Sequence, residues 1–281
     1  MKAMILAAGL GTRLRPLTDT RPKALVELNG RTLLEITITR LKSFGVTELI
    51  INVHHFADMV IDYLKSQNNF DMRLEISREE LLLDTGGGLK KAAWFFLENS
   101  SPNDPSRQDE PFLLHNVDIL STIDLTQMLQ FHNQNQALAT LAVQSRESSR
   151  QLLFNEKNQL VGRRIHNENA VISSEARNLS SISSPDVNAT NSTSDSSLAT
   201  SHSFTLTGSG PLPQPLAFSG IHAISPRLLP LLTEQGIFSI IPAYLRLAAQ
   251  NEKIQAFRAD AYYWRDLGRP SDLAQAALDL Q

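Results

Sequence analysis

Short apolar runs alternate with amphipathic stretches along the first half of the chain. The short runs predict buried strands, and apolar residues recurring every three or four positions predict helices. The predicted strands are Met4–Ala7, Leu49–Val53, Arg73–Ser77, Phe112–Val117 and Leu138–Val143. The predicted helices between them are Thr32–Phe44, Ala57–Ser66, Gly88–Glu98 and Leu125–Asn133. This alternation predicts an α/β fold with a parallel sheet covered by helices on both faces.

The pattern changes after residue 150. Leu152–Asn155 and Leu160–Arg164 predict a β-hairpin. A tract rich in Ser, Thr and Asn follows at 169–213, and its scarcity of large apolar residues predicts a disordered insertion. Beyond it, the pattern predicts strands at Leu216–Ala223, Ile254–Arg258 and Ala261–Asp266, and helices at Pro226–Leu232, Ile240–Gln250 and Pro270–Leu280.

A loop with glycines and cations follows the first predicted strand. Gly9 and Gly11 come first, and Arg13, Arg15 and Lys23 follow. Glycines let backbone N–H groups approach an anion closely, and cations neutralise its charge. Neither a P-loop nor a dinucleotide fingerprint fits the spacing. The loop therefore predicts a polyphosphate cradle at the carboxyl end of a strand, although an ordinary loop with surface cations also fits these residues.

Two carboxylates and a second glycine segment extend the candidate site. Asp118 and Asp266 each end a predicted strand, where a carboxylate can hold Mg²⁺ together with substrate phosphates or can simply cap a loop. The segment Asp84–Gly88 precedes a predicted helix. Its three glycines predict a loop that faces an anion or ligand, with a flexible connector as the alternative.

Composition narrows the classes of function. The chain has 281 residues, 42% of them hydrophobic, a net charge of −3 and no cysteine. This charge predicts no nucleic-acid partner, and the absence of cysteine excludes thiol chemistry. No apolar run is long enough for a signal peptide or a membrane span. We therefore expect a cytoplasmic protein, either a monomer or a small homo-oligomer.

The segment Ala7–Thr18, followed by Arg21-Pro22-Lys23, resembles the opening of the sugar-1-phosphate nucleotidyltransferases. The segments that end at Asp118 and surround Asp266 resemble two further elements of that family, except that Val117 stands where glycine is usual. The resemblance implies a Rossmann-like, mostly parallel mixed sheet with helices on both faces. It also implies a single nucleotidyltransferase domain over residues 1–281, interrupted by the insertion.

The same resemblance implies a reaction in which a nucleoside triphosphate and a sugar 1-phosphate give a nucleotide sugar and pyrophosphate. It implies catalytic roles for Arg13 and Lys23 and a Mg²⁺ ion on Asp118 and Asp266. The implied substrate-binding residues are Ala7, Ala8, Gly9, Gly11, Thr12, Glu79, Thr85, Gly86, Gly87, Asn116, Ser219 and Gly220. The residue that binds the acceptor phosphate stays unassigned, because the family's Glu-Lys-Pro element is missing.

Within the family, the segments Thr85–Gly88 and Leu216–Ile221 and the lack of a β-helix appendage favour UTP and N-acetylmuramate 1-phosphate, and hence cell-wall recycling. Mannose- and heptose-1-phosphate guanylyltransferases share much of the pattern and stay open as alternatives. A non-catalytic nucleotide-sugar-binding protein is the alternative from another class.

Overall fold

The computed structural model describes residues 1–98, 110–165, 171–172 and 211–280. Most of the predicted disordered insertion, 169–213, lies outside the described residues. The exceptions are Val171–Ile172, which form strand β11, and residues 211–213.

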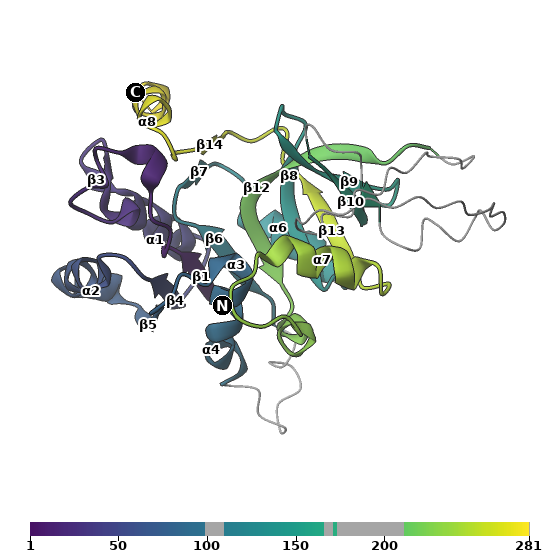
Figure 1. The fold of residues 1–281 in the computed structure, drawn as a ribbon, viewed down its shortest axis with the longest axis horizontal. Coiled ribbons are helices and arrows are strands. Elements are labelled where there is room, and N and C mark those ends of the chain that lie inside the picture. Colours follow the sequence, from purple (N-terminus) through teal and green to yellow (C-terminus); the bar gives the residue numbers. More distant parts are fainter. Residues whose placement is uncertain (99–109, 166–170, 173–210, 281) are drawn as a thin grey trace, which may run out of the picture.

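A ten-stranded mixed sheet forms the centre of the molecule (Figure 1). Its strands are β1 (Lys2–Leu6), β4 (Glu48–Val53), β5 (Arg73–Arg78), β6 (Phe112–Asn116), β8 (Ala139–Gln144), β9 (Arg150–Phe154), β10 (Leu160–Ile165), β11 (Val171–Ile172), β12 (Gln214–Ile224) and β13 (Ile254–Arg258). The order is β11-β10-β9-β12-β6-β1-β4-β5, and β8 joins β12 to β13. Two small sheets pair β2 (Glu27–Leu28) with β3 (Arg31–Thr32), and β7 (Ile119–Ser121) with β14 (Trp264–Asp266).

The sheet is parallel in its N-terminal part and antiparallel around β12. Strand β1 pairs in parallel with both β4 and β6, and β4 pairs in parallel with β5, which confirms the predicted parallel arrangement of the first half. The long strand β12 instead runs antiparallel to β6, β8 and β9. The fold is therefore the predicted α/β class with a mixed sheet.

The helices are α1 (Leu33–Ser43), α2 (Ala57–Ser66), α3 (Asp84–Lys91), α4 (Ala93–Leu97), α6 (Leu125–Gln134), α7 (Ile240–Ala248) and α8 (Pro270–Asp279). Short 3₁₀ helices are η1 (Thr12–Leu14), η2 (Lys23–Leu25), η3 (Asn68–Asp71) and η5 (Pro226–Leu231). Local sequence explains several helix ends: the Thr32 hydroxyl accepts a hydrogen bond from the Glu35 amide at 3.0 Å and caps α1, and Gly45 follows that helix with φ +83°.

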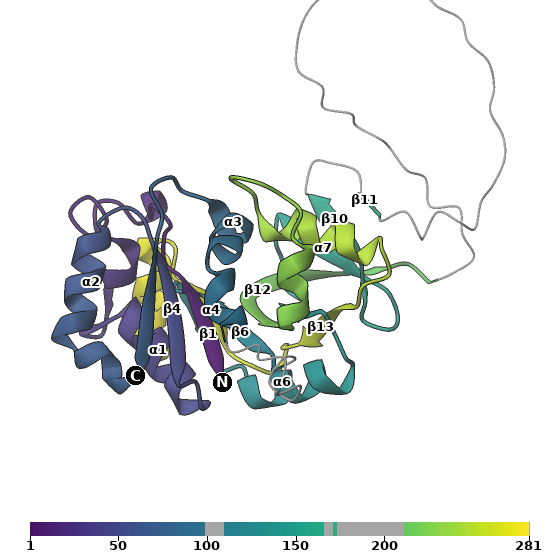
Figure 2. The ribbon, with the colours of Figure 1, turned by 90° about the horizontal axis from the view of Figure 1, so that it is seen from below.

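Side chains that alternate along the strands supply two hydrophobic cores on opposite faces of the sheet. Ala3 and Ile5 of β1 point into one core with α1, α2, α6 and α8, whereas Met4 points into the other with α3, α4 and α7. Helices α3 and α7 pack against each other on that second face (Figure 2). Burying one large aliphatic side chain stabilises such a core by about 1.5–3 kcal/mol.

Three helix predictions are corrected by the structure. The predicted helix Gly88–Glu98 consists of two helices, α3 and α4, which are separated at Ala92. The glycines of Asp84–Gly88 lie inside α3 and do not form a loop ahead of it. The segment from Pro226 is a 3₁₀ helix, and Pro230 within it has no N–H to donate to an α-helical ladder.

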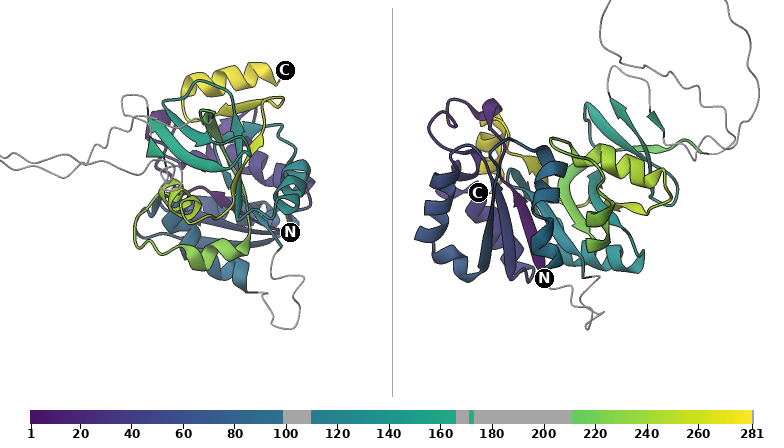
Figure 3. Two further views of the ribbon diagram at one scale, coloured as in Figure 1. Left: turned by 90° about the vertical axis from the view of Figure 1, so that its right-hand side faces the viewer. Right: turned by 60° about the horizontal axis from the view of Figure 1, so that its bottom comes forward.

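The last helix of the chain packs against a segment from its N-terminal part. Helix α8 contacts β2 and lies at the edge of the molecule (Figures 1 and 3). Strand β14, just before α8, pairs with β7, which follows β6. Residues near 266 are thereby brought to the carboxyl ends of β1 and β6, where the predicted site lies.

Candidate functional site

The glycine loop after β1 is held in place by contacts from other parts of the chain. The Ala7 amide donates to Oδ1 of Asn52 on β4 at 2.7 Å. The Thr18 hydroxyl donates to the Gly11 carbonyl at 2.9 Å. Gly11 has φ +66°, and a Cβ there would lie 2.9 Å from Cγ2 of Thr18, so both backbone angle and space require glycine.

Two cations meet two carboxylates beside this loop. Lys23 begins η2, and its Nζ pairs with Oδ2 of Asp118; both side chains are almost buried. The guanidinium of Arg13 approaches Oδ2 of Asp266 at 3.6 Å from the solvent side. The Leu267 amide donates to the Asp118 carbonyl at 2.8 Å and so ties the two aspartate segments together. Four of the charged residues predicted from the sequence, the two cations and the two aspartates, are therefore neighbours.

The two aspartates act on each other electrostatically. Burial, and then the negative charge of Asp118, raise the pKa of Asp266, while Lys23 and Arg13 lower it in part. Two neighbouring oxygen ligands that repel each other fit a divalent cation, which would relieve that repulsion. Within the described part of the chain no cluster of three or more metal-type side chains exists, so substrate phosphates would have to supply further ligands.

A buried polar network lies next to the loop. Nδ2 of Asn52 donates to Oε1 of Glu79 at 2.7 Å, and Oε2 of Glu79 accepts from the Leu83 amide at 2.9 Å. Glu79 is 2% exposed and Asn52 is 3% exposed. The network links the Ala7 amide to the start of α3, so it sets the spacing between the glycine loop and that helix. Sequence analysis missed Asn52, although a polar residue near the end of an apolar strand was the available signal.

A cavity of about 390 Å³ opens beside these residues. The predicted residues that line it are Ala8, Gly9, Lys23, Glu79, Thr85, Asn116 and Asp118. The lining residues outside the predicted list of binding residues are Leu6, Asn52, Leu82, Asp84, Val117 and Ile237. Of these, Ile237 is an exposed apolar side chain from the loop before α7. The cavity therefore joins the glycine loop to an apolar rim.

The glycines of α3 have a packing role that the sequence did not reveal. The amides of Gly86 and Gly87 donate to the Phe238 carbonyl at 2.9 and 3.1 Å, so neither N–H is free for an anion. A Cβ on Gly86 would lie 2.3 Å from the Phe238 ring. The hydroxyl of Thr85 accepts from the Ile240 amide at 3.0 Å. Only Thr85 of these three predicted binding residues lines the cavity.

The remaining predicted residues do not line the cavity. They are Ala7, Gly11, Thr12, Arg13, Gly86, Gly87, Ser219, Gly220 and Asp266. Ser219 and Gly220 lie where the pairing of β12 with β8 shifts register, and the Trp264 indole donates to the Ser219 carbonyl at 2.8 Å. Val117, which replaces the family's glycine, is 4% exposed and packs in the core with an ordinary negative φ.

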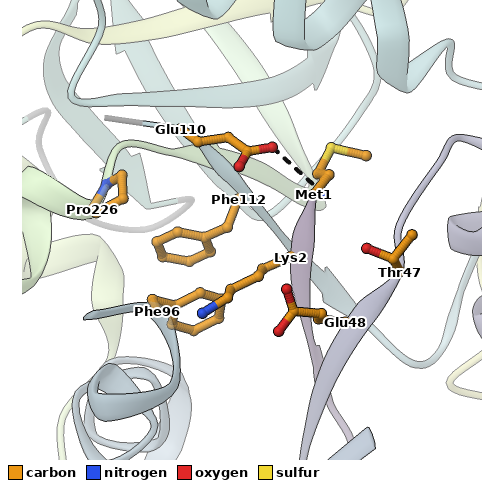
Figure 4. A pocket seen from close by; sticks show the side chains of 8 residues that line it. All are labelled: Met1, Lys2, Thr47, Glu48, Phe96, Glu110, Phe112 and Pro226. Atoms are coloured by element: carbon orange, nitrogen blue, oxygen red, sulfur yellow. Dashed lines mark ion pairs between the residues drawn. The ribbon is translucent and has the colours of Figure 1, made fainter. Parts of the chain in front are cut away.

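A different cavity, of about 350 Å³, lies at the amino end of β1 (Figure 4). Met1 and Lys2 line it, and the Met1 amine is 3.5 Å from Oε1 of Glu110. The Lys2 amine donates to the Phe95 carbonyl, and burial lowers the pKa of Lys2. Among the residues that the structure describes, this end of the strand has no glycine loop and no pair of aspartates, so we assign the candidate site to the carboxyl end.

Comparison with known proteins identifies the family. A model of the nucleotidyl transferase family matches residues 2–152, and the chain belongs to that family, as the sequence resemblance predicted. A segment of 93 residues is 48% identical to the N-acetylmuramate alpha-1-phosphate uridylyltransferase of Caulobacter vibrioides, covering 32% of this chain and 38% of that protein. Another of 144 residues is 35% identical to the mannose-1-phosphate guanyltransferase of Aspergillus fumigatus, covering 51% and 37%.

These alignments span less than two fifths of either relative's length. Over the whole chain, the fold is similar to that of a solved structure, HddC from Yersinia pseudotuberculosis complexed with GMP-PN. The TM-score is 0.66 at 18% identity, with 100% of this chain and 99% of that chain covered. This likeness confirms the nucleotidyltransferase fold. Among the described residues, no helix has the length and apolar character needed to span a membrane.

Proposed function

We propose that this protein transfers a nucleotidyl group from a nucleoside triphosphate to a sugar 1-phosphate and releases pyrophosphate. The observation that supports this most strongly is the meeting of Lys23 with Asp118, and of Arg13 with Asp266, beside the glycine loop. The cavity next to them has room for a nucleotide, and one cation and one carboxylate of these pairs, Lys23 and Asp118, line it.

In the proposed reaction, an oxygen of the sugar phosphate attacks the α-phosphorus in line, and pyrophosphate leaves on the opposite side. The chain's contribution is positioning and charge neutralisation. Arg13 and Lys23 neutralise the triphosphate, and the backbone of Ala8 and Gly9 faces it. No general base is required, because a phosphate monoester is ionised near neutral pH.

Asp118 and Asp266 would hold Mg²⁺, which supplies charge neutralisation and polarisation of phosphate oxygens when it is bound. Lys23 pairs with Asp118 beside the cavity. From this position its amine would contact a phosphate oxygen of the bound triphosphate, and the β7–β14 pairing holds Asp266 in place.

The substrates we propose are UTP and N-acetylmuramate 1-phosphate, in a cytoplasmic cell-wall recycling reaction. The strongest support is the 48% identity to the uridylyltransferase of Caulobacter vibrioides across 93 residues. The guanyltransferase of Aspergillus fumigatus supports GTP and mannose 1-phosphate as the second candidate pair. A sensor without activity is less well supported, because all four charged residues expected of an active site are present and adjacent.

The test is pyrophosphate release with Mg²⁺ for each of UTP, GTP, dTTP and CTP against N-acetylmuramate, N-acetylglucosamine, mannose and glucose 1-phosphates. We expect UTP with N-acetylmuramate 1-phosphate to react fastest. Asp118→Asn and Asp266→Asn should each lower kcat/KM by about 100-fold or more, equivalent to roughly 3 kcal/mol. Asp62→Asn, on the exposed surface of α2, is the matched control.

If no pair of substrates gave pyrophosphate and the folded protein still bound nucleotide, the result would favour a non-catalytic nucleotide-sugar-binding protein. Normal turnover by both aspartate variants would show that the metal assignment is wrong.

A further inference from the structure

Arg146 is a charged side chain near the candidate site that the proposed function does not yet use. It follows strand β8, and its guanidinium carbon lies 3.7 Å from the centroid of the Trp264 ring. Its Nη2 donates to the Phe218 carbonyl of β12 at 2.7 Å. An aromatic face and a carbonyl thus hold the guanidinium plane in a fixed orientation.

Most of the hydrogen-bonding capacity of Arg146 is unused. A guanidinium carries several N–H donors, yet only Nη2 has a protein acceptor among the described residues. Its Nε is buried without any partner, and no carboxylate within the described ranges forms an ion pair with it. A buried N–H without an acceptor is costly to the fold alone, and an anion supplied from outside the chain would give this guanidinium an acceptor.

The position of Arg146 indicates which anion. Trp264 and Asp266 are two residues apart on β14, so their side chains share one face of that strand. Because Arg146 stacks on Trp264, it lies beside the strand that carries Asp266. Arg146 is therefore near a proposed metal ligand, where the acceptor's reacting phosphate must come.

A second unpaired polar group adjoins the same place. The hydroxyl of Ser219 is buried without a hydrogen-bond partner, and Ser219 is 0% exposed. Its carbonyl accepts from the Trp264 indole, so the hydroxyl and the Arg146 platform belong to one cluster. Arg164, at the end of the hairpin strand β10, is by contrast exposed and donates to Gln151 at 2.6 Å.

We propose that Arg146, held against Trp264, binds the anionic group of the acceptor sugar 1-phosphate. This inference rests on the proposed nucleotidyltransferase function. The planar guanidinium suits a phosphate or a carboxylate, which it can bind with two parallel hydrogen bonds. The acceptor's phosphate has that chemistry, and so does the lactyl carboxylate of an N-acetylmuramate.

The experiment compares wild type with Arg146→Met, which keeps side-chain length and apolar packing over Trp264 but removes the charge. Arg146→Lys keeps the charge and loses the planar fork. The control is Arg150→Met, an exposed arginine at the start of β9. Pyrophosphate release is measured with N-acetylmuramate 1-phosphate and with N-acetylglucosamine 1-phosphate, which lacks the lactyl carboxylate.

Arg146→Met should raise the acceptor KM by about 10- to 100-fold, as expected for the loss of a charged hydrogen-bond pair, and leave the KM for UTP within about twofold. The acceptor KM of Arg146→Lys should lie between that of wild type and that of Arg146→Met, and the acceptor KM of the control should match wild type. A higher KM for both acceptors identifies the phosphate as the bound group. A higher KM for N-acetylmuramate 1-phosphate alone identifies the carboxylate.

An unchanged acceptor KM in Arg146→Met, with wild type active, would overturn the inference and leave the proposed function standing. So would a KM that rises equally for UTP and acceptor, because that is the sign of a structural role. If wild type is inactive, calorimetric titration with each sugar 1-phosphate decides. Binding that is lost in Arg146→Met supports the inference, and no binding by wild type overturns both proposals.

Discussion

Replacement of Asn52 by leucine should damage both stability and nucleotide binding. Leucine has the same branched shape and number of heavy atoms as asparagine but cannot accept from the Ala7 amide or donate to Glu79, which Asn52 does at 2.7 Å in each case. Both partners are buried, at 4% and 2% exposure, so water cannot replace the lost bonds. The perturbation thus removes polar contacts without creating a cavity.

The expected magnitude follows from the two bonds. An amide left unpaired in a buried place costs about 1–3 kcal/mol, and a hydrogen bond to a carboxylate is worth about 1.5–3 kcal/mol. The extra apolar area of leucine returns about 1–2 kcal/mol. The free energy of unfolding should therefore fall by about 2–4 kcal/mol. Because Ala7 begins the glycine loop, the KM for the nucleoside triphosphate should rise about tenfold.

Urea unfolding of wild type and Asn52→Leu measures the stability change by linear extrapolation, and pyrophosphate release measures the KM. Asn133→Leu is the control, because Asn133 is exposed on α6 and should change stability by less than about 0.5 kcal/mol. An Asn52→Leu variant as stable as this control, or with an unchanged KM for the triphosphate, would refute the reasoning.

Other expectations follow from the cavity rim, from α3 and from a buried histidine. Ile237→Ser should raise the KM for the triphosphate about threefold to tenfold with little change in unfolding, since Ile237 lines the cavity while 65% exposed. Leu81→Ser, at a 69% exposed position outside the lining, should change neither quantity. Gly86→Ala should lower the free energy of unfolding by about 1–3 kcal/mol, because its Cβ would lie 2.3 Å from the Phe238 ring. Burial, and then a nearby arginine, lower the pKa of His132 from 6.5 to about 4. His132 should therefore lower the free energy of unfolding by up to about 3 kcal/mol as the pH falls from 6.5 to 4. Urea unfolding at both pH values should show a smaller decrease in His132→Gln.

Each of these has an outcome that contradicts it. Equal effects of Ile237→Ser and Leu81→Ser would mean that Ile237 does not contact the nucleotide. A more stable Gly86→Ala variant would mean that helix propensity, about 1 kcal/mol in favour of alanine, outweighs the contact with Phe238. For His132, the sign is fixed by proton uptake: only the unfolded state binds the proton between pH 6.5 and 4, so a stability that rises on acidification would exclude the mechanism.

The residues of the proposed catalytic centre come from segments that lie far apart in the chain. The glycine loop and Lys23 come from the first strand and its loop, and Asp118 comes from the end of β6. Asp266 and Trp264 come from β14, close to the C-terminal helix. The proposed acceptor site draws on both parts of the chain: Arg146 lies within residues 2–152, which the family model matches, whereas Trp264 and Asp266 lie beyond them. We expect acceptor specificity to depend on both parts.

The local pattern of residues determined those strands, helices and loops whose formation depends mainly on neighbouring residues. Short apolar runs predicted β1, β4, β5 and β6, and the spacing of apolar residues predicted α1 and α2, because strand and helix periodicity is a local property. Glycines followed by cations predicted the loop after β1 for the same reason. The resemblance added Asp118 and Asp266 as partners, which periodicity alone could not connect.

Only the tertiary structure decided which distant residues meet. The antiparallel course of β12, the pairing of β14 with β7 and the burial of the glycines of α3 against Phe238 all join segments far apart in the chain. The same holds for the contact of Asn52 with the Ala7 amide and for Arg146 on Trp264. Such contacts depend on which surfaces pack together, and the free energy of that packing belongs to the whole fold and not to any segment of the sequence.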